Sequence, residues 1–157
     1  MLLQRLAPSL QFTARRMASV FSGVPLKRNG GGSEDSSKLS NKVVGVYFSA
    51  HWCPPCRNFT PILKDFYDEI SDDDFEIVFV SLDRSEGDLN TYLKEAHGKW
   101  LYVPFGDKNI ESLSEKFGVS GIPALIILKP DGTVITKEGR AAVQSKPPKA
   151  ALSSWKA

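Results

Sequence analysis

Two short apolar segments with an amphipathic segment between them constrain the fold of this chain more than any other feature. Val43–Ser49 and Phe75–Leu82 are rich in β-branched and aromatic residues, as buried strands are. Between them, the sequence predicts a helix over 56–70, kinked at Pro61, because apolar residues recur at helical spacing. These residues are Phe59, Ile62, Leu63, Phe66, Tyr67 and Ile70. A strand, a helix and a second strand in this order indicate parallel pairing within a βαβ unit.

The alternation continues toward the C-terminus. Ser85 can cap one helix and Asp107 another, with the extended segment Trp100–Phe105 between them. A Pro-Asp-Gly turn then joins two further strands, Ala124–Leu128 and Thr133–Lys137. We therefore predict an α/β fold in which helices flank both faces of a central mixed β-sheet, with the final hairpin adding antiparallel edge strands.

Composition excludes several classes of protein. At 157 residues, 41% hydrophobic and 24% charged, the chain is large enough for one globular core. No run of 18 apolar residues is present, so the sequence predicts no transmembrane helix. Two cysteines are too few for a multi-disulfide scaffold, and a net charge of +2 does not by itself predict a nucleic-acid or membrane partner.

The N-terminal segment differs in charge from the rest. The net charge of +2 divides into +5 for residues 1–33 and −3 for the remainder. Residues 1–21 contain arginine, serine and spaced leucines but no acid, a composition typical of a mitochondrial presequence. We therefore expect a mitochondrial location if translation starts at Met1. A start at Met17 would leave the protein in the cytoplasm and nucleus.

Both cysteines lie in one short motif, Trp52-Cys53-Pro54-Pro55-Cys56, where the first strand passes into the first helix. At a helix start, free amide groups and the positive end of the helix dipole stabilise a thiolate, so we expect Cys53 to have a lowered pKa and to attack disulfides. Cys56, one turn further on, is expected to be less exposed and to act as the resolving thiol. Pro54 and Pro55 restrict the conformations of the ring that the two cysteines would close.

Two other uses of the cysteine pair agree less well with the sequence. A structural disulfide would stabilise little, because a ring this small removes little chain entropy. A zinc site would need His51 and His97, and neither has ligand spacing relative to the cysteines, so we predict no metal site. The sequence therefore favours a catalytic dithiol.

Segments beyond the cysteine motif share their pattern with a known family. They are Tyr47–Ala50, Trp52–Arg57, Phe59–Pro61, Phe66-Tyr67, Phe75–Ser81, Trp100–Phe105 and Gly121–Pro123. On these segments, residues 42–140 resemble thioredoxin-fold proteins of the tryparedoxin and nucleoredoxin branch. The resemblance implies a thioredoxin fold, with Cys53 as the nucleophile, Cys56 as the resolving cysteine and Trp52 as a shield beside them.

The resemblance also implies a substrate groove. It makes Pro123 the cis-proline of that groove, although a proline at this position could equally begin a strand. Ile122 can then offer backbone groups to an extended substrate peptide.

Other residues near the motif have more than one possible role. Thioredoxins proper carry a buried aspartate at the place of Tyr47, so proton transfer is left to Tyr47, Asp83 or water. Asp83 fits a loop cap better than a base. Arg57 either favours the Cys53 thiolate or is an ordinary exposed helix residue, and we interpret Trp100 as a core residue.

The sequence thus predicts a thiol-disulfide oxidoreductase that reduces protein disulfides, with a redox-gated adaptor of nucleoredoxin type as the alternative. No nucleotide or flavin fingerprint is present, so we expect no bound cofactor and reducing equivalents from an external reductase or a small thiol. Expected partners are disulfide-containing proteins, a peroxiredoxin among them, and neither nucleic acid nor membrane.

The predicted organisation has four parts. Residues 1–21 are the leader, 22–41 a flexible lead-in that contains a glycine run, and 42–140 the thioredoxin-like domain. Residues 141–157 form a divergent C-terminal tail, because the acidic-Pro segment and Phe-Pro-Trp ending common in the family are missing there.

Overall fold

The computed structural model describes residues 20–157, so nearly all of the expected leader lies outside the described part of the chain. A seven-stranded sheet has the order β2-β1-β5-β4-β3-β6-β7. Its strands are β1 (Leu26–Arg28), β2 (Ser33–Glu34), β3 (Val43–Ser49), β4 (Phe75–Ser81), β5 (Leu101–Tyr102), β6 (Ala124–Leu128) and β7 (Val134–Thr136). The helices are α2 (Pro54–Ile70), α3 (Glu86–Ala96), α4 (Asn109–Lys116), α5 (Gly139–Ser145) and α6 (Pro148–Lys156), with a 3-10 helix at Ser36–Leu39.

The sheet is mixed, as predicted. β3 pairs in parallel with β4, and β4 with β5, whereas β6, β7 and the N-terminal hairpin add antiparallel pairs. Every residue of β3 and β4 is buried, because helices cover both faces of these central strands. The prediction of a thioredoxin fold with helices on both faces is confirmed.

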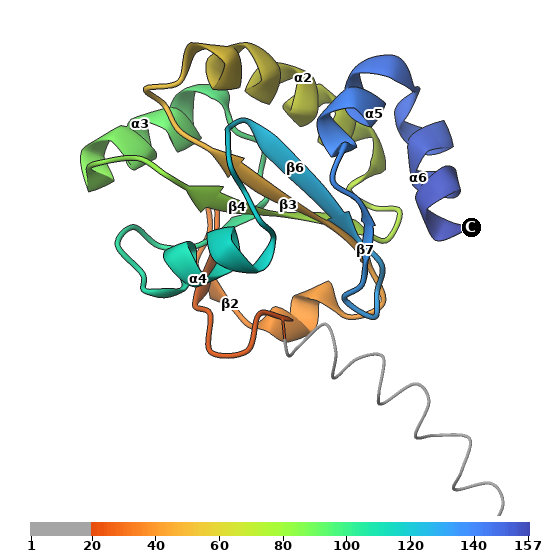
Figure 1. Ribbon diagram of the computed structural model, residues 1–157, viewed down its shortest axis with the longest axis horizontal. Coiled ribbons are helices and arrows are strands. Elements are labelled where there is room, and N and C mark those ends of the chain that lie inside the picture. The colour runs from red at the N-terminus through yellow and green to blue at the C-terminus, as the bar shows by residue number, and fades with distance from the viewer. Residues whose placement is uncertain (1–19) are drawn as a thin grey trace, which may run out of the picture.

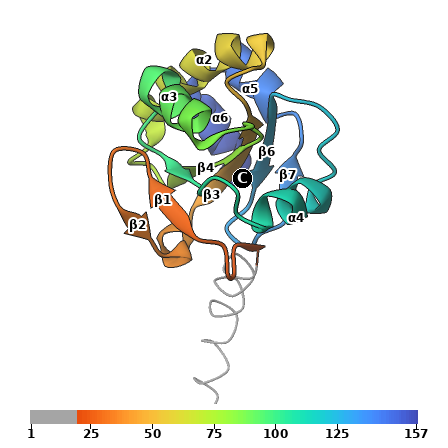
Figure 2. The ribbon, with the colours of Figure 1, turned by 90° about the vertical axis from the view of Figure 1, so that its left-hand side faces the viewer.

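Alternation along β3 divides the core into two layers. Tyr47 points into the layer under α2, α3, α5 and α6, whereas Val46 and Phe48 point into the layer that contains Leu113 and Phe117, at the end of α4. Figures 1 and 2 show the four helices on one face and α4 on the other. The α2 face was predicted with one error, because Ile62 is 43% exposed.

The expectation of a flexible lead-in over 22–41 is wrong. β1 pairs antiparallel with β5, the side chains of Leu26 and Leu39 are buried, and Phe21, assigned to the leader, is also buried in this layer. Isolated apolar residues among polar ones give no periodicity, so this hairpin cannot be recognised without its distant partner strand.

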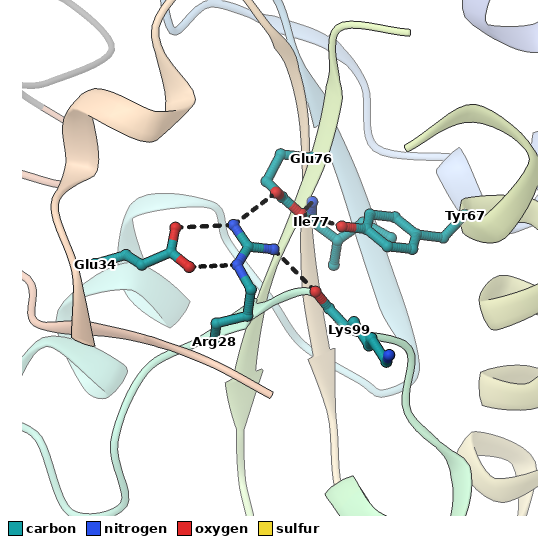
Figure 3. A network of polar contacts seen from close by, with 6 residues as sticks. All are labelled: Arg28, Glu34, Tyr67, Glu76, Ile77 and Lys99. Carbon is teal, nitrogen blue, oxygen red and sulfur yellow. Dashed lines mark hydrogen bonds and ion pairs between the residues drawn. The ribbon is translucent and has the colours of Figure 1, made fainter. Parts of the chain in front are cut away.

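An ion-pair network ties this hairpin to the sheet (Figure 3). The Arg28 guanidinium binds Glu34 of β2 and lies 3.1 Å from Oε2 of the buried Glu76 in β4, and it also donates to the carbonyl of Lys99. Tyr67 of α2 donates to the other oxygen of Glu76 at 2.8 Å. Because the Glu76 charge is bonded on both sides, it is tolerated in the interior.

The end of the domain at residue 140 is also wrong. α5 and α6 pack on the sheet, and Trp155 stacks on Phe75 with ring centroids 5.9 Å apart. Pro147 caps α6 and Pro148 opens its first turn, where a missing N–H costs nothing. The packed domain therefore continues through residue 155.

Candidate active site

The two cysteines lie at the junction of β3 and α2. Cys53 is the N-cap of α2, and it is joined by a disulfide to Cys56, with the Cα atoms 5.2 Å apart. Pro54 and Pro55 have no N–H, so the first amide that α2 can offer is that of Cys56, which donates to Cys53 Sγ at 3.3 Å. On reduction, the same amide is placed to stabilise a thiolate on Cys53.

The two sulfurs differ in access. Cys53 is 5% exposed and Cys56 is fully buried, so only Cys53 can be reached from outside. Ala50, Leu82 and Ile122 pack around the pair and give it an apolar surrounding. The predicted order of exposure is therefore observed.

Ile122 and Pro123 lie beside the disulfide. The peptide bond between them is cis, and the carbonyl oxygen of Ile122 is 3.8 Å from Cys53 Sγ. The pairing of Phe48 with Ala124 explains this proximity, because it sets the start of β6 against the end of β3. Pro123 is buried and Ile122 half-buried, which leaves part of Ile122 at the surface next to the reactive sulfur.

Trp52 forms an exposed aromatic surface next to the cysteines. It is 44% exposed, its indole N–H donates to the carbonyl of Leu82 at 3.1 Å, and the Arg84 guanidinium lies 4.8 Å from its ring centroid. Sequence reasoning missed Arg84, although the parallel pairing of β3 and β4 brings the residues after both strands to one edge of the sheet.

Arg57 and Asp83 both hold the backbone of His51, just before the motif. Arg57 donates to the His51 carbonyl at 2.6 Å, and Asp83 Oδ1 accepts the His51 amide at 2.7 Å. Asp83 Oδ2 accepts a further bond from Ser81. These contacts make Asp83 a cap for the loop between β3 and α2.

Tyr47 is fully buried beneath α2, and its hydroxyl is 2.6 Å from that of Thr60. Burial raises the pKa of Tyr47, so this group is neutral at physiological pH. The Thr60 hydroxyl is also 2.6 Å from the hydroxyl of Tyr92, which is in turn 2.6 Å from that of Ser49. Sequence reasoning did not single out Thr60 or Tyr92 as site residues, since both lie on helix faces that pack inward.

A pocket of about 440 Å³ opens beside Leu82 and Asp83, between the end of β4 and the segment leading into α4. Phe105, which is 38% exposed, contributes an apolar wall, and Lys108 and Glu111 contribute charges. Because the Leu82 carbonyl is also bonded to Trp52, the pocket is next to the exposed indole.

Within residues 20–157, no group of three or more histidine, cysteine or acidic side chains is placed to hold a metal ion. Over the same residues, no helix is long and apolar enough to span a membrane. His97, one of the two histidines considered for zinc, is buried among aromatic rings and accepts a bond from Trp100.

Comparison with known proteins gives a consistent result. Residues 41–134 match the family model described as thioredoxin-like. Nucleoredoxin of Mus musculus is 50% identical over 122 residues, which are 76% of this chain and 28% of that protein. The chain thus spans little more than a quarter of the length of the mouse and human nucleoredoxins.

Solved structures extend the match to three dimensions. A thioredoxin from Wuchereria bancrofti is 61% identical, covers 84% of this chain and 93% of its own, and superposes with a TM-score of 0.74. Tryparedoxin I from Crithidia fasciculata is 36% identical over 85% of this chain and 93% of its own, with a TM-score of 0.76. With the Cys-x-x-Cys pair at the start of α2, these matches show that the chain belongs to the thioredoxin-like family of oxidoreductases, with nucleoredoxins and tryparedoxins among its relatives.

Proposed function

We propose that this chain is a protein-disulfide reductase in which Cys53 attacks and Cys56 resolves. The observation that carries the proposal is the asymmetry of the pair. Cys53 keeps 5% of its surface exposed and has the Cys56 amide 3.3 Å from its sulfur, whereas Cys56 is fully buried. An ionised outer sulfur with a sheltered second sulfur is the arrangement that a two-step exchange requires.

The steps follow from this arrangement. The Cys53 thiolate attacks one sulfur of a substrate disulfide, forming a mixed disulfide and releasing the other substrate sulfur, which takes up a proton. Cys56 then loses its proton and attacks Cys53, closing the Cys53–Cys56 bond and releasing the second substrate thiol. Two electrons pass from the dithiol to the substrate, and the disulfide seen in the structure is the oxidised end of the cycle.

Trp52, Ile122 and Pro123 are proposed to contact the substrate. The exposed indole belongs to the residue before Cys53, and the carbonyl oxygen of Ile122 is 3.8 Å from Cys53 Sγ. An extended peptide could pair with the backbone of Ile122 while an apolar side chain rests on Trp52.

Members of this family act on disulfides and receive electrons from a reductant, so both kinds of partner are implied for this chain. The finer assignments are proposals. We propose an external reductase or a small thiol as donor and a peroxiredoxin among the substrates, supported by the relatives that carry the name tryparedoxin.

Insulin reduction with a chemical reductant tests the proposed activity. The wild type should accelerate precipitation of the insulin chains, and Cys53→Ser should not. Cys56→Ser should trap mixed disulfides with several proteins through Cys53. A single partner retained without a covalent bond, even by the double variant Cys53→Ser/Cys56→Ser, would instead favour the redox-gated adaptor.

We also propose that residues 1–21 direct the chain to mitochondria when translation starts at Met1, and that a start at Met17 leaves it in the cytoplasm and nucleus. The cationic, acid-free composition of this segment supports the proposal. A reporter fused to residues 1–22 should enter mitochondria, and a diffuse reporter would refute this.

A further inference from the structure

Four buried hydroxyl groups meet under the first turns of α2. Thr60 Oγ1 is 2.6 Å from the hydroxyl of Tyr47 and 2.6 Å from that of Tyr92, which is itself 2.6 Å from Ser49 Oγ. Thr60 Oγ1 also donates to the carbonyl oxygen of Cys56 at 2.9 Å. All four side chains are buried, so water does not compete for these bonds.

The direction of every bond in this group follows from counting protons. Four hydroxyls supply four protons for four bonds, and the Cys56 carbonyl can only accept. Thr60 must therefore donate to Cys56, so Tyr47 and Tyr92 donate to Thr60, and Ser49 donates to Tyr92. Each proton is used once, and the group ends at the backbone of the resolving cysteine.

The Cys56 carbonyl lies next to a carbonyl that lacks its helical hydrogen bond, because Pro61 has no N–H to donate to Arg57. The Thr60 hydroxyl adds a bond at this point from within the helix. Tyr47 of β3 and Tyr92 of α3 orient that hydroxyl from two other elements.

We propose that Thr60, oriented by Tyr47 and Tyr92, is a positioning residue for the resolving step, holding the backbone of Cys56 so that its sulfur stays within reach of Cys53 once the disulfide is open. This rests on the proposed function, because it concerns the second step of that cycle. The Cys56 thiol loses its proton, its sulfur bonds to Cys53, and the bond from Cys53 to the substrate breaks, with the electron pair and a proton leaving on the substrate thiol.

The two steps can be timed separately with reduced full-length protein and dithiobis-nitrobenzoate, a disulfide whose thiolate is coloured. Attack by Cys53 releases one coloured thiolate at a rate that rises with reagent concentration. Resolution by Cys56 releases the second at a rate that does not. High reagent concentrations therefore isolate the resolving step.

Thr60→Val keeps the shape of the side chain and removes its hydroxyl. We expect the resolving step to slow by about three- to tenfold, the kinetic equivalent of one lost buried hydrogen bond, and the attack step to stay unchanged. Thr60→Ser should restore the wild-type rate. Tyr92→Phe and Tyr47→Phe each remove one of the two donors to Thr60 and should slow resolution by about twofold.

Tyr67→Phe is the matched control, because it removes a buried hydroxyl of α2 that donates to Glu76 and takes no part in the Thr60 group. It should leave both steps unchanged. If Thr60→Val does not fold, the resolving rate of Tyr92→Phe is compared with that of the control Tyr67→Phe. An unchanged resolving rate in the hydroxyl variants, or an equal slowing of both steps, overturns the inference. Failure of attack in the wild type overturns the proposed function instead.

Discussion

At the scale of single residues, the chemistry of this chain depends on where its cysteines are. Cys53 ends the loop from β3 and precedes two residues without an N–H, so its sulfur receives the first free amide of α2. Cys56, in the first turn of α2, is on the buried face of that helix. Two cysteines at other positions of the chain would have neither a helix-start amide donating to one sulfur nor this difference in solvent exposure.

Asp83 allows a test of loop capping against proton transfer. Its Oδ1 accepts the His51 amide at 2.7 Å, and an asparagine oxygen can accept the same bond. Asp83→Asn should therefore keep most of the insulin-reduction rate, whereas Asp83→Ala should lose about 1–3 kcal/mol of unfolding free energy through the unsatisfied amide. Denaturant unfolding and the insulin assay measure both. An equal loss of activity in the two variants would identify Asp83 as a proton carrier.

At the scale of elements, the C-terminal helices complete the layer that supports α2. α6 packs against α2 and β3, and Trp155 contacts both Phe66 and Phe75. Because α2 carries both cysteines, the last helix of the chain stabilises the element on which the site is built.

Trp155→Ala should therefore destabilise the fold by about 3–5 kcal/mol, the usual cost of removing a large buried aromatic side chain. Trp52→Ala is the matched control, since the same side chain is removed where it is 44% exposed. That variant should lose no more than about 1 kcal/mol. Urea unfolding measures both, and similar losses in the two variants would contradict the packing of α6 described above.

At the scale of the whole molecule, the sequence predicted the parts whose signals are local. Val43–Ser49 and Phe75–Ser81 are uninterrupted apolar runs, and both are central strands. Leu26 is buried where β1 pairs with β5, which lies far along the chain, and Val143 is buried where α5 packs on β6. The lead-in and the tail were therefore misassigned.

Some residues of the candidate site could be predicted from the sequence and others could not. Cys53 and Cys56 were recognised by spacing alone, and the resemblance added Trp52 and Pro123. Thr60 could not be recognised, because its role exists only when Tyr92 of α3 is brought against α2. A hydroxyl on a buried helix face has no signature that separates it from an ordinary core residue.

Buried His97 makes the stability of the whole domain depend on pH. Burial lowers its pKa to about 3, and its Nδ1 accepts a bond from Trp100 at 3.1 Å. The unfolded chain binds this proton below about pH 6.5, but the folded chain does so only near the lowered value, so acid favours unfolding. The contribution of neutral His97 is complete above about pH 6.5 and declines as the pH falls toward the lowered pKa.

His97→Asn keeps an acceptor for Trp100 but cannot titrate. Between about pH 6.5 and 5, the wild type should lose up to ~1.4 kcal/mol of unfolding free energy per pH unit more than this variant. Urea unfolding of both proteins across that range measures the difference. Parallel curves would show that His97 is protonated equally in the folded and unfolded states.

In the reduced protein, Cys53 is expected to be ionised at neutral pH, and Cys56 is expected to stay inaccessible to external reagents and to react second, with Cys53. The most direct measurement is the rate at which iodoacetamide alkylates the reduced protein as a function of pH, with the modified cysteine identified by mass spectrometry. We predict that Cys53 reacts first and that its alkylation rate rises with pH to a plateau, with a midpoint well below the ~8.5 of a free thiol. A midpoint near that of a free thiol, or equal reaction of Cys56, would contradict it.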